Sequence, residues 1–153
     1  MKRILILITI LLCIFGCSKK KDLPDEEIIE NKEEVMKELV LKIDDQEVEV
    51  NWEDNESVEA LKDLVLNQPL TIDMSMYGGF EQVGEIGTEI TRNDSQTTTN
   101  PGDIVLYAGD NIVIFYGSNS WAYTRLGKIE NLNNDELKEL LGNHDVKVEL
   151  SLK

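Results

Sequence analysis

The chain has 153 residues, a length that suits one domain with additional segments, and its 41% hydrophobic residues allow a buried core. Thirty acidic residues stand against 15 lysines and arginines, so the formal net charge is −15. Such a surface repels phosphate backbones, and nucleic acid is therefore excluded as an expected partner.

The first 16 residues are typical of a secretory signal. A basic start, Met1 to Arg3, precedes an apolar run of about twelve residues. That run is too short to span a bilayer, which needs about 20 residues, but it fits a signal peptide. The run ends in "IFGC", which resembles the lipobox of bacterial lipoproteins. The resemblance implies cleavage before Cys17 and attachment of acyl chains, palmitate among them, to that residue. The alternative is an ordinary signal peptide with an incidental cysteine.

Cleavage at this point would leave a folded part without cysteine, because Cys13 departs and Cys17 carries lipid. A disulfide framework, a thiolate metal site and a cysteine nucleophile are then excluded. Residues 17–36 are dense in charge and contain no aromatic side chain. We interpret them as a solvated tether between the membrane and a domain formed by residues 37–153.

The first half of the domain begins with alternating residues at 38–44 and 47–52, which predict a β-hairpin around "DDQ". Residues 55–68 have helical spacing, with Asn55 or Ser57 as the N-cap and Pro69 limiting the end. A strand is expected over 69–77, with Leu70, Ile72, Met74 and Met76 on one face.

The second half begins with the glycine-rich stretch 78–87 and a loop over 88–103 that ends in a Pro101-Gly102 turn. A hairpin follows at 104–107 and 111–117, and then a strand at 120–130. A short capped helix ends at Gly142, and residues 146–152 alternate as a last strand. Seven or eight short strands with two helices fit one small β-barrel most simply.

Three motifs, "FEQVGEIG", "TRNDSQTTTNPGDIVLY" and "SNSWAYTRLGKI", resemble the bacterial cyclophilin-like fold family. The resemblance covers residues 38–152. It implies a mainly β fold, a closed eight-stranded cyclophilin-like barrel with two short helices.

In true cyclophilins, which catalyse peptidyl-prolyl isomerisation, a catalytic arginine lies next to an aromatic residue and a glutamine follows. Phe80 and Gln82 match the aromatic and the glutamine, but no arginine lies between Thr71 and Gly87. A guanidinium stabilises the twisted prolyl bond by hydrogen bonding, whereas an apolar pocket alone binds both states alike. We therefore expect no catalytic residue and a binding module for a peptide segment or small ligand. The alternative is a peptidyl-prolyl isomerase with an atypical site that uses Arg92 or Arg125.

The candidate groove contains side chains from the three motifs together with Met76 and Tyr77, which are expected to lie near Phe80 and Gln82: Met76, Tyr77, Phe80, Gln82, Arg92, Tyr107, Trp121, Tyr123 and Arg125. Phe80 and Gln82 are expected to share one concave face, as residues i and i+2 of an extended segment do. For the arginines we favour an ion pair with Asp94, Asp103 or Glu85 over direct ligand contact. For Tyr107, Trp121 and Tyr123 we favour the barrel wall or its rim.

No cofactor and no metal site is expected. The expected partners are the membrane, through the lipid anchor, and a peptide or small-molecule ligand. We expect a monomer at the extracytoplasmic face of the cell membrane.

Overall fold

The computed structural model describes residues 37–153. The predicted signal peptide (1–16), the predicted tether (17–36) and the proposed lipidation residue Cys17 lie outside the described residues. Within residues 37–153, no helix is long and apolar enough to cross a membrane.

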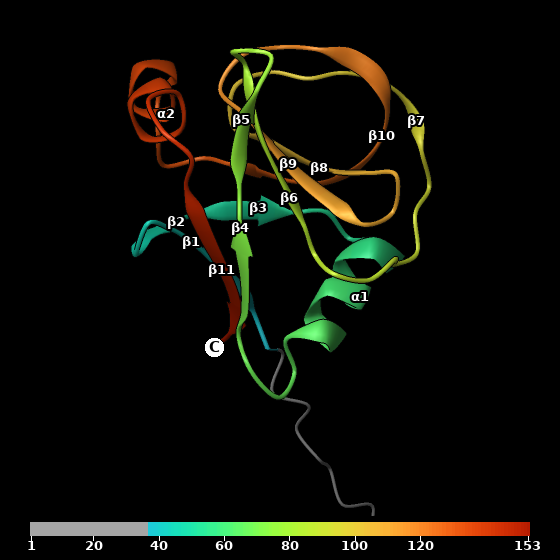
Figure 1. The fold of residues 1–153 in the computed structure, drawn as a ribbon. Coiled ribbons are helices and arrows are strands. Elements are labelled where there is room, and N and C mark those ends of the chain that lie inside the picture. The colour runs from blue at the N-terminus through green and yellow to red at the C-terminus, as the bar shows by residue number, and fades with distance from the viewer. Residues whose placement is uncertain (1–36) are drawn as a thin grey trace, which may run out of the picture. The chain divides into compact units, whose positions relative to one another are not determined.

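The domain contains two sheets, antiparallel in every pairing of residues 37–153, that pack face to face (Figure 1). The four-stranded sheet has the order β2 (Gln46–Val48), β1 (Leu39–Ile43), β11 (Lys147–Leu152) and β4 (Leu70–Asp73). The path of the seven-stranded sheet is β3 (Val50–Trp52), β10 (Ser120–Ile129), β8 (Asp103–Tyr107), β9 (Asn111–Phe115), β6 (Glu81–Glu85) and β5 (Ser75–Tyr77), and β7 (Ser95–Thr98) pairs with β10 off this path.

The chain passes from one sheet to the other at two corners. Glu49 separates β2 from β3, and Met74 separates β4 from β5, so each expected long strand is divided between the sheets. At the second corner the Met74 amide donates to the Val146 carbonyl at 2.8 Å. At these corners the sheets are joined by the chain and not by a continuous ladder of strand pairs. Within residues 37–153, the two edge strands of each sheet do not pair with each other, so neither sheet forms a closed barrel. The mainly β fold with two helices is confirmed, but the expected closed eight-stranded barrel is not observed.

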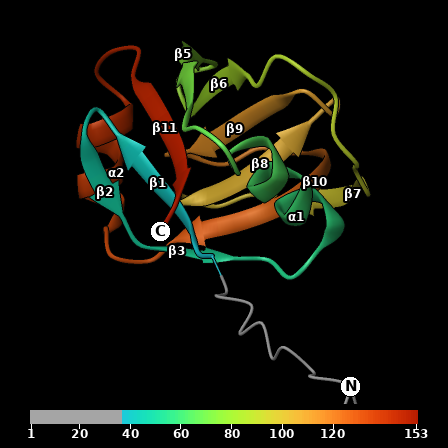
Figure 2. The ribbon, with the colours of Figure 1, turned by 90° about the horizontal axis from the view of Figure 1, so that it is seen from below.

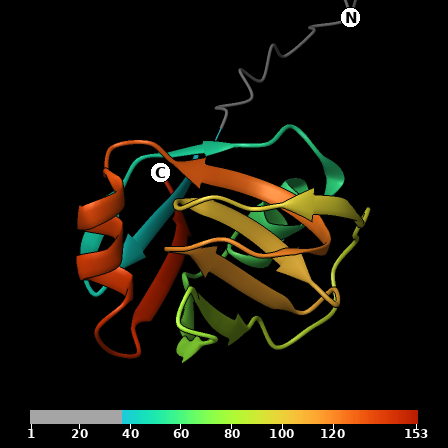
Figure 3. The ribbon, with the colours of Figure 1, turned by 90° about the horizontal axis from the view of Figure 1, so that it is seen from above.

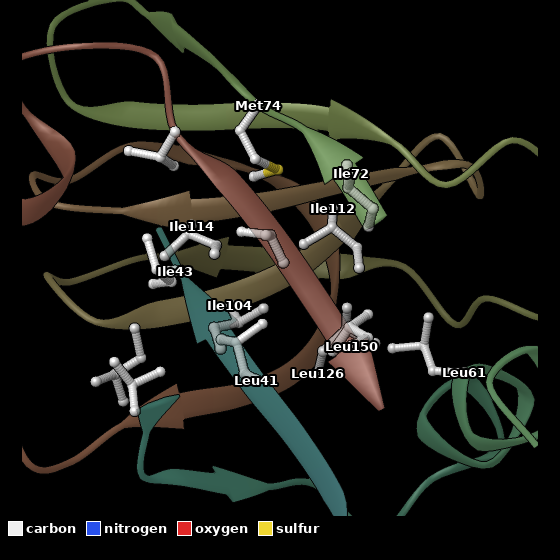
Figure 4. Close-up of a cluster of buried hydrophobic side chains, with 14 of the residues drawn as sticks. Leu41, Ile43, Leu61, Ile72, Met74, Ile104, Ile112, Ile114, Leu126 and Leu150 are labelled. Carbon is white, nitrogen blue, oxygen red and sulfur yellow. The ribbon is translucent and has the colours of Figure 1, made fainter. Parts of the chain in front are cut away.

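The main core fills the space between the two sheets. Figure 4 shows its side chains converging from β1, β4, β8, β9, β10, β11 and the first helix. Ile72 and Met74 belong to this core, as the alternation predicts. Met76 does not, because it lies beyond the corner and remains 42% exposed.

The two helices lie apart, one at the left edge of the domain and the other on the far side of β1 and β11, as the views from below and above show (Figures 2 and 3). Asn55 caps α1 (Glu56–Leu64) by accepting from the Val58 amide at 3.0 Å. In α2 (Asn134–Leu141), Asn133 and Glu136 form a reciprocal capping box, and Gly142 is the C-cap residue. Both helices therefore begin and end close to the predicted positions.

Candidate functional site

A second, smaller apolar cluster covers the outer face of the seven-stranded sheet, the face turned away from the main core. Successive strand residues point to opposite faces. Ile104, Ile112 and Ile114 thus belong to the main core, while Val105 and Val113 belong to the outer cluster. Phe115 and Tyr123 complete the buried part of this cluster, and their ring centroids lie 5.8 Å apart in an edge-to-face arrangement. The outer face is consequently built as a surface that holds aromatic rings in place.

Over this cluster lies a pocket of about 300 Å³. Its walls are aromatic and come from three strands: Tyr77 from β5, Tyr107 from β8, and Trp121 and Tyr123 from β10. Val83 and Val113, which face each other across β6 and β9, also line it. This volume is at the lower end of the range typical of small-molecule sites.

Hydrogen bonds fix the polar side of the pocket. The Asn119 side-chain amide donates to the Tyr123 hydroxyl at 3.0 Å. Asn119 is held in turn by the fully buried Thr99, whose amide donates to the Asn119 carbonyl at 2.8 Å. The Tyr123 ring is thereby positioned from both ends, by Phe115 at its base and by Asn119 at its hydroxyl.

One carboxyl group lines this otherwise uncharged pocket. Glu81 is 6% exposed and lies directly opposite Tyr77 in the β5–β6 ladder. Its Oε2 atom is buried without a hydrogen-bond partner, and no ion pair to Glu81 forms within residues 37–153. Burial raises the pKa of Glu81 from 4.5 to about 7. Burial and the charge of Glu81 also raise the pKa of Tyr116 and of Tyr123.

The glycine pair before Glu81 forms the tight turn between β5 and β6. Gly78 and Gly79 have φ values of +62° and +75°, which glycine adopts without strain, and with Phe80 they form the three-residue loop between the paired residues Tyr77 and Glu81. Phe80 ends this loop and stacks on Phe115 with ring centroids 6.5 Å apart. A side chain at Gly117 would collide with the Phe80 Cβ atom. Phe80 thus packs beside the pocket cluster and does not line the pocket itself.

Gln82 departs most from the expected arrangement. It is fully buried, and its Nε2 donates to the Leu141 and His144 carbonyls, both at 2.7 Å. Since Gln82 alternates with Glu81 and Val83, its side chain points to the opposite face of the sheet. The expectation that Phe80 and Gln82 share a concave surface is wrong, because Phe80 belongs to the turn and does not set the alternation of β6.

Both arginines form ion pairs away from the pocket lining. Arg125 lies 3.2 Å from Asp103 and 3.5 Å from Glu53, and Arg92 lies 3.5 Å from Asp94. Carboxylate partners were expected for both residues, and the structure contains them. Asp103 is itself only 1% exposed, so Arg125 neutralises a buried charge there.

Of the nine groove candidates, the structure brings Tyr77, Tyr107, Trp121 and Tyr123 together around the pocket. Met76, Phe80, Gln82, Arg92 and Arg125 do not line it. Sequence reasoning missed four lining residues, which are Glu81, Val83, Val113 and Asn119. The alternation of "EQV" could have indicated the first two, because it places Glu81 and Val83 on one face and Gln82 on the other.

A family model for the cyclophilin-like family matches residues 41–153. No curated protein sequence matches the chain. The solved structures similar to it include two that each have a TM-score of 0.54 and each match 74% of this chain. One is the solution structure of the hypothetical protein AF2241 from Archaeoglobus fulgidus, 21% identical and covered over 92% of its length. The other is McbB in complex with tryptophan, 14% identical. This chain spans 44% of the length of McbB.

Proposed function

The chain belongs to the cyclophilin-like family, and from that premise we propose that it is a membrane-anchored, extracytoplasmic binding module without isomerase activity. Its ligand is a small organic molecule held in the aromatic pocket of the outer face. This proposal rests on the pocket itself, which has four aromatic side chains over a rigid apolar cluster and about 300 Å³ of space.

The packing of the pocket supports binding rather than a purely structural role. Tyr77 and Trp121 are 68% and 58% exposed although they face an apolar hollow. Large aromatic side chains left this exposed beside a cavity are typical of ligand contacts. A ligand would cover these rings without reorganising Tyr123, which its neighbours already hold in place.

The similarity to McbB supports a small ligand over a long peptide. That protein was solved in complex with tryptophan, a small aromatic molecule. In the present chain, the pocket volume also suits a molecule of one or two rings.

The placement of the arginines argues against isomerase activity. Catalysis of prolyl rotation by electrostatic stabilisation needs a donor aimed at the twisted amide. Arg92 and Arg125 are paired with carboxylates and neither lines the pocket. We expect no acceleration in a protease-free isomerisation assay on a proline peptide. Acceleration that is lost in Arg125→Lys or Arg92→Lys would contradict this proposal.

Intrinsic fluorescence tests binding directly, because the chain has only two tryptophans. Trp52 lies away from the pocket, with its indole nitrogen donating to the Leu39 carbonyl at 2.8 Å. In Trp52→Phe, Trp121 is the sole reporter and should change emission when 2-phenylethanol or 2-phenylethylamine is added. Trp121→Phe is the matched control, in which Trp52 should not respond. An unresponsive Trp121 together with no heat of binding would overturn the binding function.

The anchor is proposed from the residues before the domain. A short apolar run that ends in Cys17 supports lipidation of this cysteine, and two acyl chains give stable anchoring where one does not. Mass spectrometry of the mature N-terminus should find modified Cys17, and the protein should partition with membranes. An unmodified N-terminus at another residue would refute the anchor and leave the binding function untouched.

A further inference from the structure

Glu81 is a polar group in a place where a protein rarely leaves one unpaired. It is nine-tenths buried, its Oε2 atom has no hydrogen-bond partner, and it faces the hollow of the pocket. Burying a carboxyl group without a partner costs free energy, so such a group needs an explanation. Glu81 belongs neither to the outer apolar cluster nor to the main core.

The groups around Glu81 indicate which charge a ligand would need in order to pair with its carboxyl group. Aromatic rings attract cations to their electron-rich faces, and four aromatic side chains line the pocket. No lysine or arginine lines the pocket, although both are available elsewhere on the domain. The net charge of −15 adds a long-range field that concentrates cations and repels anions.

Resting on the proposed binding function, we propose that the ligand is an organic cation, a protonated primary amine on a flat apolar body, whose ammonium group pairs with the Glu81 carboxylate. The apolar body packs against Trp121 and Tyr123, and Tyr77 and Tyr107 lie against it. A free amine is favoured over a lysine side chain of a peptide because the pocket has space for a ring and a short stem.

Protons compete with such a cation for Glu81. The other titratable and charged groups on the elements around it are Tyr77 from β5, Glu85 from β6, Tyr116 after β9, Asp103 and Tyr107 from β8, and Tyr123, Arg125 and Lys128 from β10. Asp103 is paired with Arg125 at 3.2 Å and with Lys128 at 3.9 Å, and Glu85 is exposed at the other end of β6. Burial raises the pKa of Tyr116 and of Tyr123 above the ordinary phenol value of 10. Between pH 6 and 8 the affinity therefore follows the protonation of Glu81, whose pKa of about 7 lies in the middle.

Calorimetry with two matched probes tests the inference on the full chain. 2-Phenylethylamine carries the cation at both pH values, and 2-phenylethanol is its neutral counterpart of nearly equal size. At pH 8 the amine should bind at least tenfold more tightly than the alcohol. At pH 6 the amine should bind about tenfold more weakly than at pH 8, while the alcohol should be unchanged.

Glu81→Gln keeps the shape and removes the charge, so it should weaken amine binding at least tenfold and leave alcohol binding within about twofold. Glu85→Gln is the matched control, because it removes the same charge from an exposed position on the same strand. It should leave both affinities within about twofold. A blocked tripeptide with a central lysine should bind more weakly than the free amine.

The outcomes separate this inference from the proposed function. If the alcohol binds as tightly as the amine, or if Glu81→Gln leaves the amine affinity unchanged, the cation is wrong while the binding module stands. If the lysine peptide binds more tightly than the amine, the small ligand is wrong. If neither probe binds, the binding function and this inference fail together.

Discussion

Glu81 holds a carboxyl group where water hardly reaches it, and the cost of doing so depends on pH. In the folded protein its pKa is about 7, whereas the ordinary value is 4.5. Between these two values the folded state binds the proton and the unfolded state has released it. The free energy of unfolding therefore falls as the pH rises from about 4.5 to about 7, and this contribution is fully lost above pH 7.

Glu81→Gln should remove this dependence, because glutamine carries no charge at any pH. We expect the variant to match the wild type near pH 4.5 and to be more stable by about 2–3 kcal/mol at pH 8. Urea unfolding at both pH values measures the difference. Glu85→Gln corrects for the change in net charge, and an equal gain in that exposed variant would contradict the burial of Glu81 as the cause.

Gln82, the next residue, contributes to stability in the opposite way. Its Nε2 donates to the Leu141 and His144 carbonyls and so attaches the end of α2 to β6. Gln82→Ala should leave both carbonyls without this donor and cost about 2–4 kcal/mol. Chemical denaturation measures the loss, with Gln96→Ala at an exposed position of β7 as the control. A loss below about 1 kcal/mol would show that water replaces the amide.

Glu81 and Gln82 show how much could be predicted from the sequence at the level of single residues. Tyr77, Tyr107, Trp121 and Tyr123 were among the groove candidates, but the barrel wall or its rim was favoured for Tyr107, Trp121 and Tyr123, whereas all four line the pocket. The role of Gln82 was not predictable, because the face of a strand residue depends on where the turn ends. If Phe80 is counted as a strand residue on the pocket face, alternation assigns Gln82 to the pocket face and Glu81 to the opposite face. The observed assignment is the reverse.

At the scale of elements, the two sheets approach each other closely where β4 passes β6. At Gly84 of β6, an added Cβ atom would lie 2.5 Å from both the Ile72 Cγ2 and the Met74 Sδ atoms, and 3.0 Å from the Asp73 carbonyl oxygen. The missing side chain lets β4 cross at this distance and then turn at Met74 toward the second sheet. Glycine is required here for close approach and not for its backbone angles.

Gly84→Ala should therefore destabilise the domain by about 1–3 kcal/mol, because core atoms of β4 must move to admit the methyl group. A thermal or chemical melt measures this cost. Glu85→Ala, at the exposed neighbour, is the control and should change stability by less than about 0.5 kcal/mol. A neutral Gly84→Ala would mean that the corner at Met74 is more adaptable than the packing indicates.

The elements differ in how far local sequence determines them. Helix α1 was predictable because Asn55 and the helical spacing act within a few residues. The corners at Glu49 and Met74 were not, because alternation continues through a corner while the hydrogen-bond partners change. Residues 69–77 were thus expected as one strand, whereas β4 and β5 pair in different sheets.

At the scale of the whole molecule, local sequence predicted the fold family but not whether the sheets form a closed barrel. The three motifs indicated the cyclophilin-like family, and the family model matches residues 41–153. Whether a barrel closes depends on pairing between strands that are distant in sequence, and side-chain patterns carry little information about that pairing. β1 illustrates this, since its partners are β2 next to it and β11 at the other end of the chain.

The pairing of β1 also determines where the domain can begin. Leu39, Leu41 and Ile43 of β1 are buried in the core between the sheets, and β1 lies between β2 and β11. A shortened chain that begins at Lys37 retains all these contacts, so it should unfold in one cooperative transition with the same midpoint as the full chain. A chain that begins at Asp44 lacks the strand and is the matched comparison. It should show no cooperative transition, because removing β1 leaves β2 without its partner strand, leaves one edge of β11 unpaired and opens the core. Differential scanning calorimetry of the two shortened chains decides the point. Loss of the transition in the chain from Lys37 would mean that earlier residues are needed to complete the domain.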